Sequence, residues 1–173
     1  MKLILKPFTE ETGLSLFFTV KQIENRLECS YNIEGDIRSL NLPKYNPEGR
    51  RHFLWLDTCF ELFLKIDGDP HYYEFNFSPG QSFNIFHFAY YRAPMIESND
   101  FSVALSPAII SDDNFSFNCS ITPLQQLDYS KINFLPTVVI KKIDGEVSYW
   151  AAKHSVEKPD FHDPTTHNFQ LYF

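Results

Sequence analysis

Hydrophobic and polar residues alternate along many short stretches of the chain, with the two-residue period of a β-strand. Between Thr58 and Ile66, the residues Phe60, Leu62 and Leu64 share one face, and Glu61 lies on the other. The same pattern predicts strands over residues 14–20, 27–33, 58–66, 71–77, 83–91, 101–110, 115–121, 137–143, 146–151 and 168–173.

Glycine, proline and aspartate separate these stretches. Asp144-Gly145 between two alternating runs is a strong hairpin signal. Residues 35–51 are polar and contain two prolines, which predicts a long loop, and residues 123–127 are expected to form one helical turn. The sequence shows no strand–helix–strand alternation, which argues against an α/β enzyme fold. Ten or so short strands predict an all-β sandwich or barrel.

Composition agrees with this class. The chain has 173 residues, enough for one domain, which we expect to span residues 1–173. Aromatic residues make up 17% of the chain and favour the half-buried surfaces of sheets, and 11 prolines disfavour long helices.

The charge limits the partners. The net charge is −7, and no basic stripe is present, so nucleic acid and anionic membranes are not expected as partners. No apolar stretch has the length of a signal peptide core or a membrane span, so a cytoplasmic location is the default expectation. The three cysteines form neither an even disulfide set nor a zinc motif, and we expect buried, reduced thiols.

Polar residues gather on one face of two neighbouring predicted strands. Glu61 lies opposite the aliphatic row of its strand, and Glu74 and Asn76 have the same position on the next. If the strands pair, these side chains converge and can accept hydrogen bonds from sugar hydroxyls, with Arg92 as a donor. Trp55 precedes the first strand and can pack on the apolar face of a sugar. The alternative is that Trp55 covers the core and the polar row is only hydrated.

A second group of functional residue types lies late in the chain. His154, His162 and His167 are close in sequence, but their spacing matches no known metal motif. Asp163-Pro164 is more typical of a turn.

The same stretches resemble the DOMON-like proteins related to family 9 carbohydrate-binding modules. The matching segments span about Arg50 to Leu171: Leu54-Trp55, Thr58-Cys59-Phe60-Glu61, Tyr73-Glu74-Phe75-Asn76-Phe77-Ser78-Pro79, Tyr91-Arg92, Tyr149-Trp150-Ala151, His154 and Lys158-Pro159-Asp160-Phe161-His162. The resemblance implies an antiparallel β-sandwich of the jelly-roll type.

In those modules two aromatic rings clamp the reducing end of a sugar, and a strand after the first ring carries a sugar-binding Glu. Trp55 and Glu61 match that pair, and Phe161 matches the second ring. The family has Trp where this chain has Phe161, and Lys158 stands near the place of the family's sugar-binding Asn. Calcium also binds to those modules, although no oxygen cage can be placed here from the sequence.

The resemblance leaves several functions open. The leading hypothesis is a non-catalytic domain that binds a carbohydrate or small polyol. A haem-binding electron carrier with Met95 and His154 as ligands is an alternative, because the wider group contains cytochrome domains. Another is a structural or partner-binding sandwich in which Arg50, Glu61, Glu74 and Arg92 form buried ion pairs. A glycosidase using Glu61 and Glu74 is disfavoured, since nothing in the sequence indicates a substrate cleft.

The predicted ligand-binding residues are Trp55, Glu61, Tyr73, Glu74, Asn76, Arg92, His154, Phe161 and His162. No catalytic residue and no metal ligand is predicted.

Overall fold

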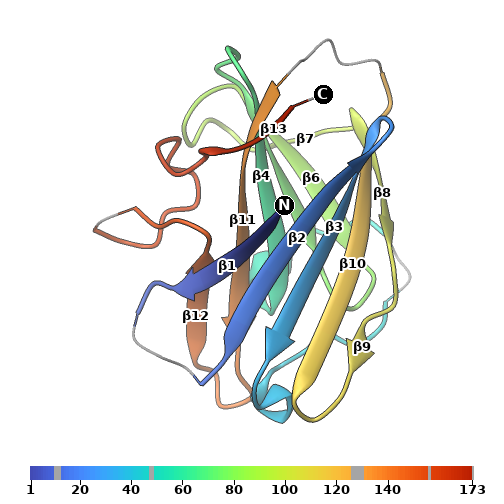
Figure 1. Ribbon diagram of the computed structural model, residues 1–173, viewed down its shortest axis with the longest axis vertical. Coiled ribbons are helices and arrows are strands. Elements are labelled where there is room, and N and C mark those ends of the chain that lie inside the picture. The colour runs from blue at the N-terminus through green and yellow to red at the C-terminus, as the bar shows by residue number, and fades with distance from the viewer. Residues whose placement is uncertain (10–12, 47–48, 126–130, 156, 173) are drawn as a thin grey trace.

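Two layers of antiparallel strands face each other in the computed structural model, which describes residues 1–9, 13–46, 49–125, 131–155 and 157–172 (Figure 1). The first layer has the order β1-β2-β3-β10-β8, and the short β9 pairs with β10. Its strands are β1 (Lys2–Pro7), β2 (Ser15–Ile23), β3 (Arg26–Glu34), β8 (Phe101–Leu105), β9 (Ile109–Ile110) and β10 (Asn114–Pro123).

The second layer has the order β7-β6-β5-β4-β11-β12, and β13 pairs with β11. Its strands are β4 (Cys59–Ile66), β5 (Tyr72–Phe77), β6 (Phe83–Phe88), β7 (Ile96–Glu97), β11 (Lys131–Lys141), β12 (Val147–Ala151) and β13 (Phe169–Tyr172). Two 3-10 turns, Ile37–Ser39 and Leu54–Leu56, lie in the connection between β3 and β4.

Strand β1 joins the layers. Its first part pairs with β2, with Leu3 opposite Phe18, and its end pairs with β12, with Pro7 opposite Trp150. The two layers are therefore parts of one sheet that curls over, closed on this side by β1.

Aromatic side chains fill the space between the layers. Phe60 of β4 stacks on Phe115 and Phe117 of β10, with ring centroids 5.3 Å apart in both pairs. Tyr31 of β3 donates a buried hydrogen bond of 2.6 Å to the carbonyl oxygen of Glu61. These contacts fix β4 from its inner face, so its outer face is held in a defined position.

The antiparallel sandwich predicted from the alternation is confirmed. Residues 115–121 lie in β10, and the Asp144-Gly145 hairpin joins β11 to β12, with Gly145 at a φ of 93°. The inner and outer faces of β4 also follow the predicted alternation, because Phe60 and Leu62 belong to the core between the layers.

Several elements differ from prediction: β7 was not expected, residues 101–110 form the two strands β8 and β9, and β11 begins at Lys131 instead of Thr137. Strand β1 was not expected. Residues 83–91 were expected to form a central strand, but β6 ends at Phe88, and only the two-residue β7 lies beyond it. The helical turn expected over 123–127 falls partly outside the described residues, and Pro123 belongs to β10. No helix in the described part of the chain is long and apolar enough to span a membrane.

Candidate functional site

Four polar residues lie side by side across the outer face of the second layer, and we call them the polar row. Strand pairing places Thr137 opposite Glu61, Glu61 opposite Asn76, and Asn76 opposite Asn84. All four are at most 3% exposed. They face away from the core because their positions alternate with those of the inward-facing Phe and Leu side chains.

Hydrogen bonds connect the polar row to its surroundings. The Thr137 hydroxyl donates to Glu61 Oε2 at 2.9 Å, and Asn76 Nδ2 donates to Glu74 Oε1 at 2.7 Å. The Cys59 thiol lies 3.6 Å from Asn76 Oδ1. Arg50 and Glu97 bind the two ends of the Asn84 amide. Asn76 is therefore a positioning residue whose amide fixes the carboxyl group of Glu74.

Glu74 lies between two aromatic residues in the neighbouring row. Phe63 of β4 is directly opposite Glu74 on one side, and Phe86 of β6 is opposite it on the other. Trp55 packs edge-to-face on Phe86 at 5.9 Å, and Phe161 packs edge-to-face on Phe63 at 6.3 Å. Trp55 and Phe161, distant in sequence, are thus supported on either side of the same carboxyl group.

A cavity of about 560 Å³ opens above this floor. Its lining residues come from the second layer, from the 3-10 turn before β4, and from the segments after β6 and β12: Trp55, Leu56, Glu61, Phe63, Glu74, Phe88, Arg92, Ala93, Met95, Val139, Tyr149, Pro159, Phe161 and His162. This volume and the mixture of rings with a few polar groups are typical of small-molecule sites.

One buried carboxylate ties the rim of the cavity together. Asp160 is 5% exposed and accepts hydrogen bonds from the Tyr91 hydroxyl at 2.6 Å and from Arg92 Nη2 at 2.8 Å. It also accepts one from the backbone N–H of His162 at 3.1 Å. Arg92 has a φ of 50°, an unusual backbone conformation for a non-glycine residue. The ion pair with Asp160 offsets part of the charge of Arg92.

The two floor carboxyl groups have raised pKa values. Burial raises the pKa of Glu61 to about 8, assisted by the nearby charge of Glu74 and opposed by the Thr137 hydrogen bond. Burial also raises the pKa of Glu74 to about 7, although the Asn76 hydrogen bond and the charge of Arg92 act against it. The pair therefore retains at least part of its protons at neutral pH.

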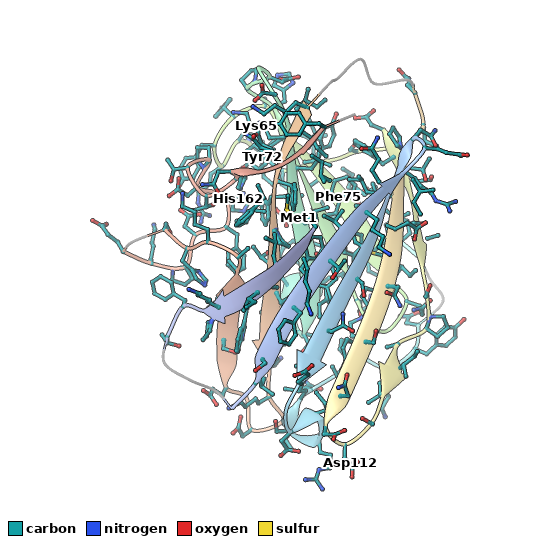
Figure 2. All side chains as sticks on the ribbon, viewed as in Figure 1. Met1, Lys65, Tyr72, Phe75, Asp112 and His162 are labelled. Carbon is teal, nitrogen blue, oxygen red and sulfur yellow. The ribbon has the colours of Figure 1, made fainter. Side chains whose placement is uncertain are left out.

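His162 stays neutral beside this pair. Burial lowers its pKa to about 4, and the charge of Arg92 contributes to the shift. Its Nδ1 lies 2.9 Å from the Tyr72 hydroxyl, and both residues are labelled in Figure 2. Its Nε2 lies 3.6 Å from Glu74 Oε2. A neutral ring can present Nε2–H toward Glu74 when Tyr72 donates to Nδ1.

Most of the predicted binding residues meet in this cavity. Six of the nine line it, namely Trp55, Glu61, Glu74, Arg92, Phe161 and His162. Asn76 lies beneath it in the polar row. The pairing of β4 with β5, on which the predicted convergence of Glu61, Glu74 and Asn76 depended, is present.

Tyr73 and His154 are not brought to the cavity. Tyr73 lies on the opposite face of β5 from Glu74, where its ring packs on Phe101 at 4.9 Å and its hydroxyl donates to Asp100. Its position follows from strand alternation, since odd-numbered residues of β5 face inward. His154 Nε2 donates a 2.7 Å hydrogen bond to the backbone oxygen of Lys6.

The ion pairs considered from the sequence are not formed. Arg50 binds Asn84 and the Ser98 carbonyl, and Arg92 binds Asp160, so neither pairs with Glu61 or Glu74. Of the two ligands of the haem alternative, Met95 lines the cavity, whereas His154 packs on Phe161 at 6.3 Å and uses Nε2 in its bond to Lys6. The structure gives that alternative no support.

Acidic side chains do not cluster into a site for calcium, the ion implied by the resemblance, in the part of the chain that the structure describes. Within the described ranges, no group of three or more His, Cys, Asp or Glu side chains is arranged to hold a metal ion. A calcium site built from carboxylates would require such a group.

Several residues of the site were missed in the sequence. Thr137 and Asn84 complete the polar row, and Tyr149 of β12 lines the cavity and packs on Phe161 at 6.1 Å. Thr137 and Tyr149 lie on predicted strands, but only the order of strands in the sheet brings them next to Glu61 and Phe161. Asp160 was part of a matching motif, and its role depends on the fold of the rim.

No protein-family model and no curated protein sequence matches this chain. Among solved structures, it is similar to a proposed carbohydrate-binding protein from Bacteroides uniformis, with a TM-score of 0.68 and 14% identity over 100% of this chain and 86% of that one. It is also similar to a family 9 carbohydrate-binding module from Caldicellulosiruptor kristjanssonii in complex with cellotriose, with a TM-score of 0.58 and 11% identity over 99% and 81%. The chain thus has the β-sandwich fold of the family 9 carbohydrate-binding modules.

Proposed function

We propose that this protein binds a carbohydrate or a related small polyol in the cavity on the second layer and does not transform it. One observation carries the proposal. Two aromatic residues from distant segments, Trp55 and Phe161, line a cavity whose floor holds two carboxyl groups. Aromatic rings bind the apolar faces of a sugar ring, and carboxyl groups bind its hydroxyls.

The fold supports this proposal without deciding it. Both solved structures described above are named as carbohydrate-binding, and one contains cellotriose. One fold hosts many functions, so the argument has to come from the site. Here the site and the fold favour the same class of ligand.

Each group in the cavity has a part in the proposed binding. Trp55 and Phe161 stack on the ligand, and Glu61 and Glu74 bind hydroxyl groups below it. Arg92 and His162 supply donors at the rim. The ring of Phe161 has no N–H group, so it contributes apolar contact but no hydrogen bond.

Binding rather than hydrolysis also fits the support of the two carboxyl groups. Glu61 already accepts a hydrogen bond from Thr137, and Glu74 accepts one from Asn76. Both are held rigidly within the sheet. We therefore expect the protein to bind oligosaccharides without releasing new reducing ends during prolonged incubation.

Trp55→Ala is the principal test. We expect it to weaken binding of the best ligand on a glycan array at least tenfold by isothermal titration calorimetry, while the far-ultraviolet circular dichroism stays unchanged. Loss of one stacking ring removes contact area but no core contact between the layers.

Tyr45→Ala is the matched control, because Tyr45 is an aromatic residue with 74% exposure outside the cavity. It should leave affinity unchanged. Full affinity in the Trp55 variant, or no ligand among the glycans tested, would contradict the proposed function.

A further inference from the structure

The two floor carboxyl groups lack a cationic partner of their own. Among the described residues, the only basic side chain within 4 Å of either carboxyl group is that of His162, which lies 3.6 Å from Glu74. The charge of Arg92 is paired with Asp160. Glu61 and Glu74 line the cavity, so a ligand can reach both.

The other groups that face this pair add no compensating charge. Burial keeps the His162 ring neutral by lowering its pKa to about 4. The Tyr72 hydroxyl has a pKa raised to about 12, and burial raises that of the Cys59 thiol well above its usual value, so both are neutral. Asn76 and Thr137 contribute only dipoles. The charge of Arg92 offsets part of the negative potential at Glu74, and bound protons or a ligand offset the rest.

The walls above the pair suit a cation. Aromatic faces attract ammonium groups, most strongly where water is excluded. Trp55, Phe63, Phe88, Tyr149 and Phe161 all line the cavity. Several rings together with two carboxylates suit a protonated amine, because both carboxylates can accept charge-assisted hydrogen bonds from one ammonium group.

We propose that the cavity selects ligands that carry a protonated amine, with an amino sugar as the carbohydrate form, and that the ammonium group binds at Glu61 and Glu74. This inference rests on the proposed function and narrows its ligand class. The ammonium group replaces a proton held by the pair, so binding releases a proton to solvent. No bond of the ligand is broken.

Three sugars that have the same ring and differ at one carbon provide the test. Glucosamine carries an ammonium group, glucose a hydroxyl group, and N-acetylglucosamine a neutral amide at the same carbon. By titration calorimetry at pH 7 we expect glucosamine to bind at least tenfold more tightly than the other two, which corresponds to about 1.4 kcal/mol. Repeating the titration in buffers of different ionisation enthalpy should reveal the released proton.

Cyclohexylamine and cyclohexanol separate the amine from the sugar. Tighter binding of cyclohexylamine than cyclohexanol supports recognition of the ammonium group itself. If cyclohexylamine binds and no sugar does, the amine inference stands and the carbohydrate function fails. If all three sugars bind equally, the carbohydrate function stands and the amine inference is overturned.

Substitutions of Glu61 and Glu74 test whether these two carboxyl groups cause the preference for glucosamine. Glu61→Gln and Glu74→Gln should each reduce the preference for glucosamine over glucose at least fivefold, and the released proton should disappear in the double variant. Glu34→Gln, at an exposed position at the end of β3, is the control and should keep the full preference. A preference that survives in both floor variants would overturn the inference, whatever the affinity for glucose.

Discussion

Glu61 occupies an unusual position for a carboxyl group, because it is 3% exposed and faces another buried carboxyl group. Its raised pKa means that the folded protein holds a proton which the unfolded chain releases above pH about 4.5. The contribution of this group to the free energy of unfolding is therefore largest below pH about 4.5, where the carboxyl group is protonated in both states. Folding becomes less favourable as the pH rises toward 8.

We therefore predict that the protein loses stability between pH 6.5 and pH 9. The melting temperature should fall by several degrees, since each kcal/mol corresponds to roughly 2–4 °C in a chain of this size. Glu61→Gln should reduce this dependence, because it removes one of the two titrating carboxyl groups and leaves Glu74, whose pKa is raised to about 7. Thermal unfolding followed by circular dichroism at both pH values measures the slope.

The His162 ring adds a small slope of opposite sign at the lower end of this range, because the unfolded ring still binds a proton near pH 6.5 whereas burial keeps the folded ring neutral. Glu34→Gln should keep the slope of the unmodified protein. A slope that is equally steep in Glu61→Gln would show that other groups cause it.

For single residues, the sequence predicted the position correctly where strand alternation alone determines which face of the sheet a side chain occupies. Glu61, Glu74 and Asn76 were placed correctly on one face, and the same alternation places Tyr73 on the other. The partners of Arg50 and Arg92 were not predictable, because Asn84 and Asp160 lie 34 and 68 positions away along the chain. Nothing local in the sequence marks such contacts.

Among the structural elements, the segment after β12 is the one that completes the site. It carries Pro159, Phe161 and His162 to the cavity, although it has no regular secondary structure there. Asp160 holds it against the turn after β6 through Tyr91 and Arg92. The position of Phe161 therefore depends on a carboxylate that does not itself line the cavity.

Asp160→Asn should loosen this connection. We expect the free energy of unfolding to fall by about 1–3 kcal/mol, because hydrogen bonds to a charged group are lost. Ligand affinity should fall as well, since Phe161 is no longer held. Urea denaturation and titration calorimetry measure the two effects.

Asp112→Asn is the control, at an exposed turn remote from Tyr72 and His162 in Figure 2. It should change neither quantity. Unchanged affinity in Asp160→Asn would show that the rim segment keeps its position without the carboxylate.

Elements with a strong period and clear turns were predicted, as β4, β5, β10 and the Asp144-Gly145 hairpin show. Strand β1 was missed because its short run, Lys2 to Pro7, contains two lysines and ends in proline. Strand β6 was predicted too long, since Tyr90 and Tyr91 continue the apolar pattern but are exposed in a turn. Only tertiary contacts distinguish these cases.

Over the molecule as a whole, the large rings between the layers connect β4 with β3 and β10. We propose that the chain unfolds as one unit. The three thiols offer a test, because Cys29 and Cys119 lie in the first layer and Cys59 in the second, and all three are buried.

Ellman's reagent should react with none of these thiols in the native protein, since burial raises the pKa of Cys59 and Cys119 and excludes the reagent. In rising urea all three should become reactive together with the loss of circular dichroism. Reaction of Cys59 at a lower urea concentration than the others would show that the layers unfold separately.

The double pairing of β1 has a mechanical consequence. On the side of β1 the two layers share one short strand, and on the far side they end in the separate edges β7 and β8. Strand β1 is therefore the one strand that is hydrogen-bonded to both layers among the described residues. A steady pull on the first residues would load the hydrogen bonds to β2 first and those to β12 next, and rupture of both sets would leave the layers without a shared strand.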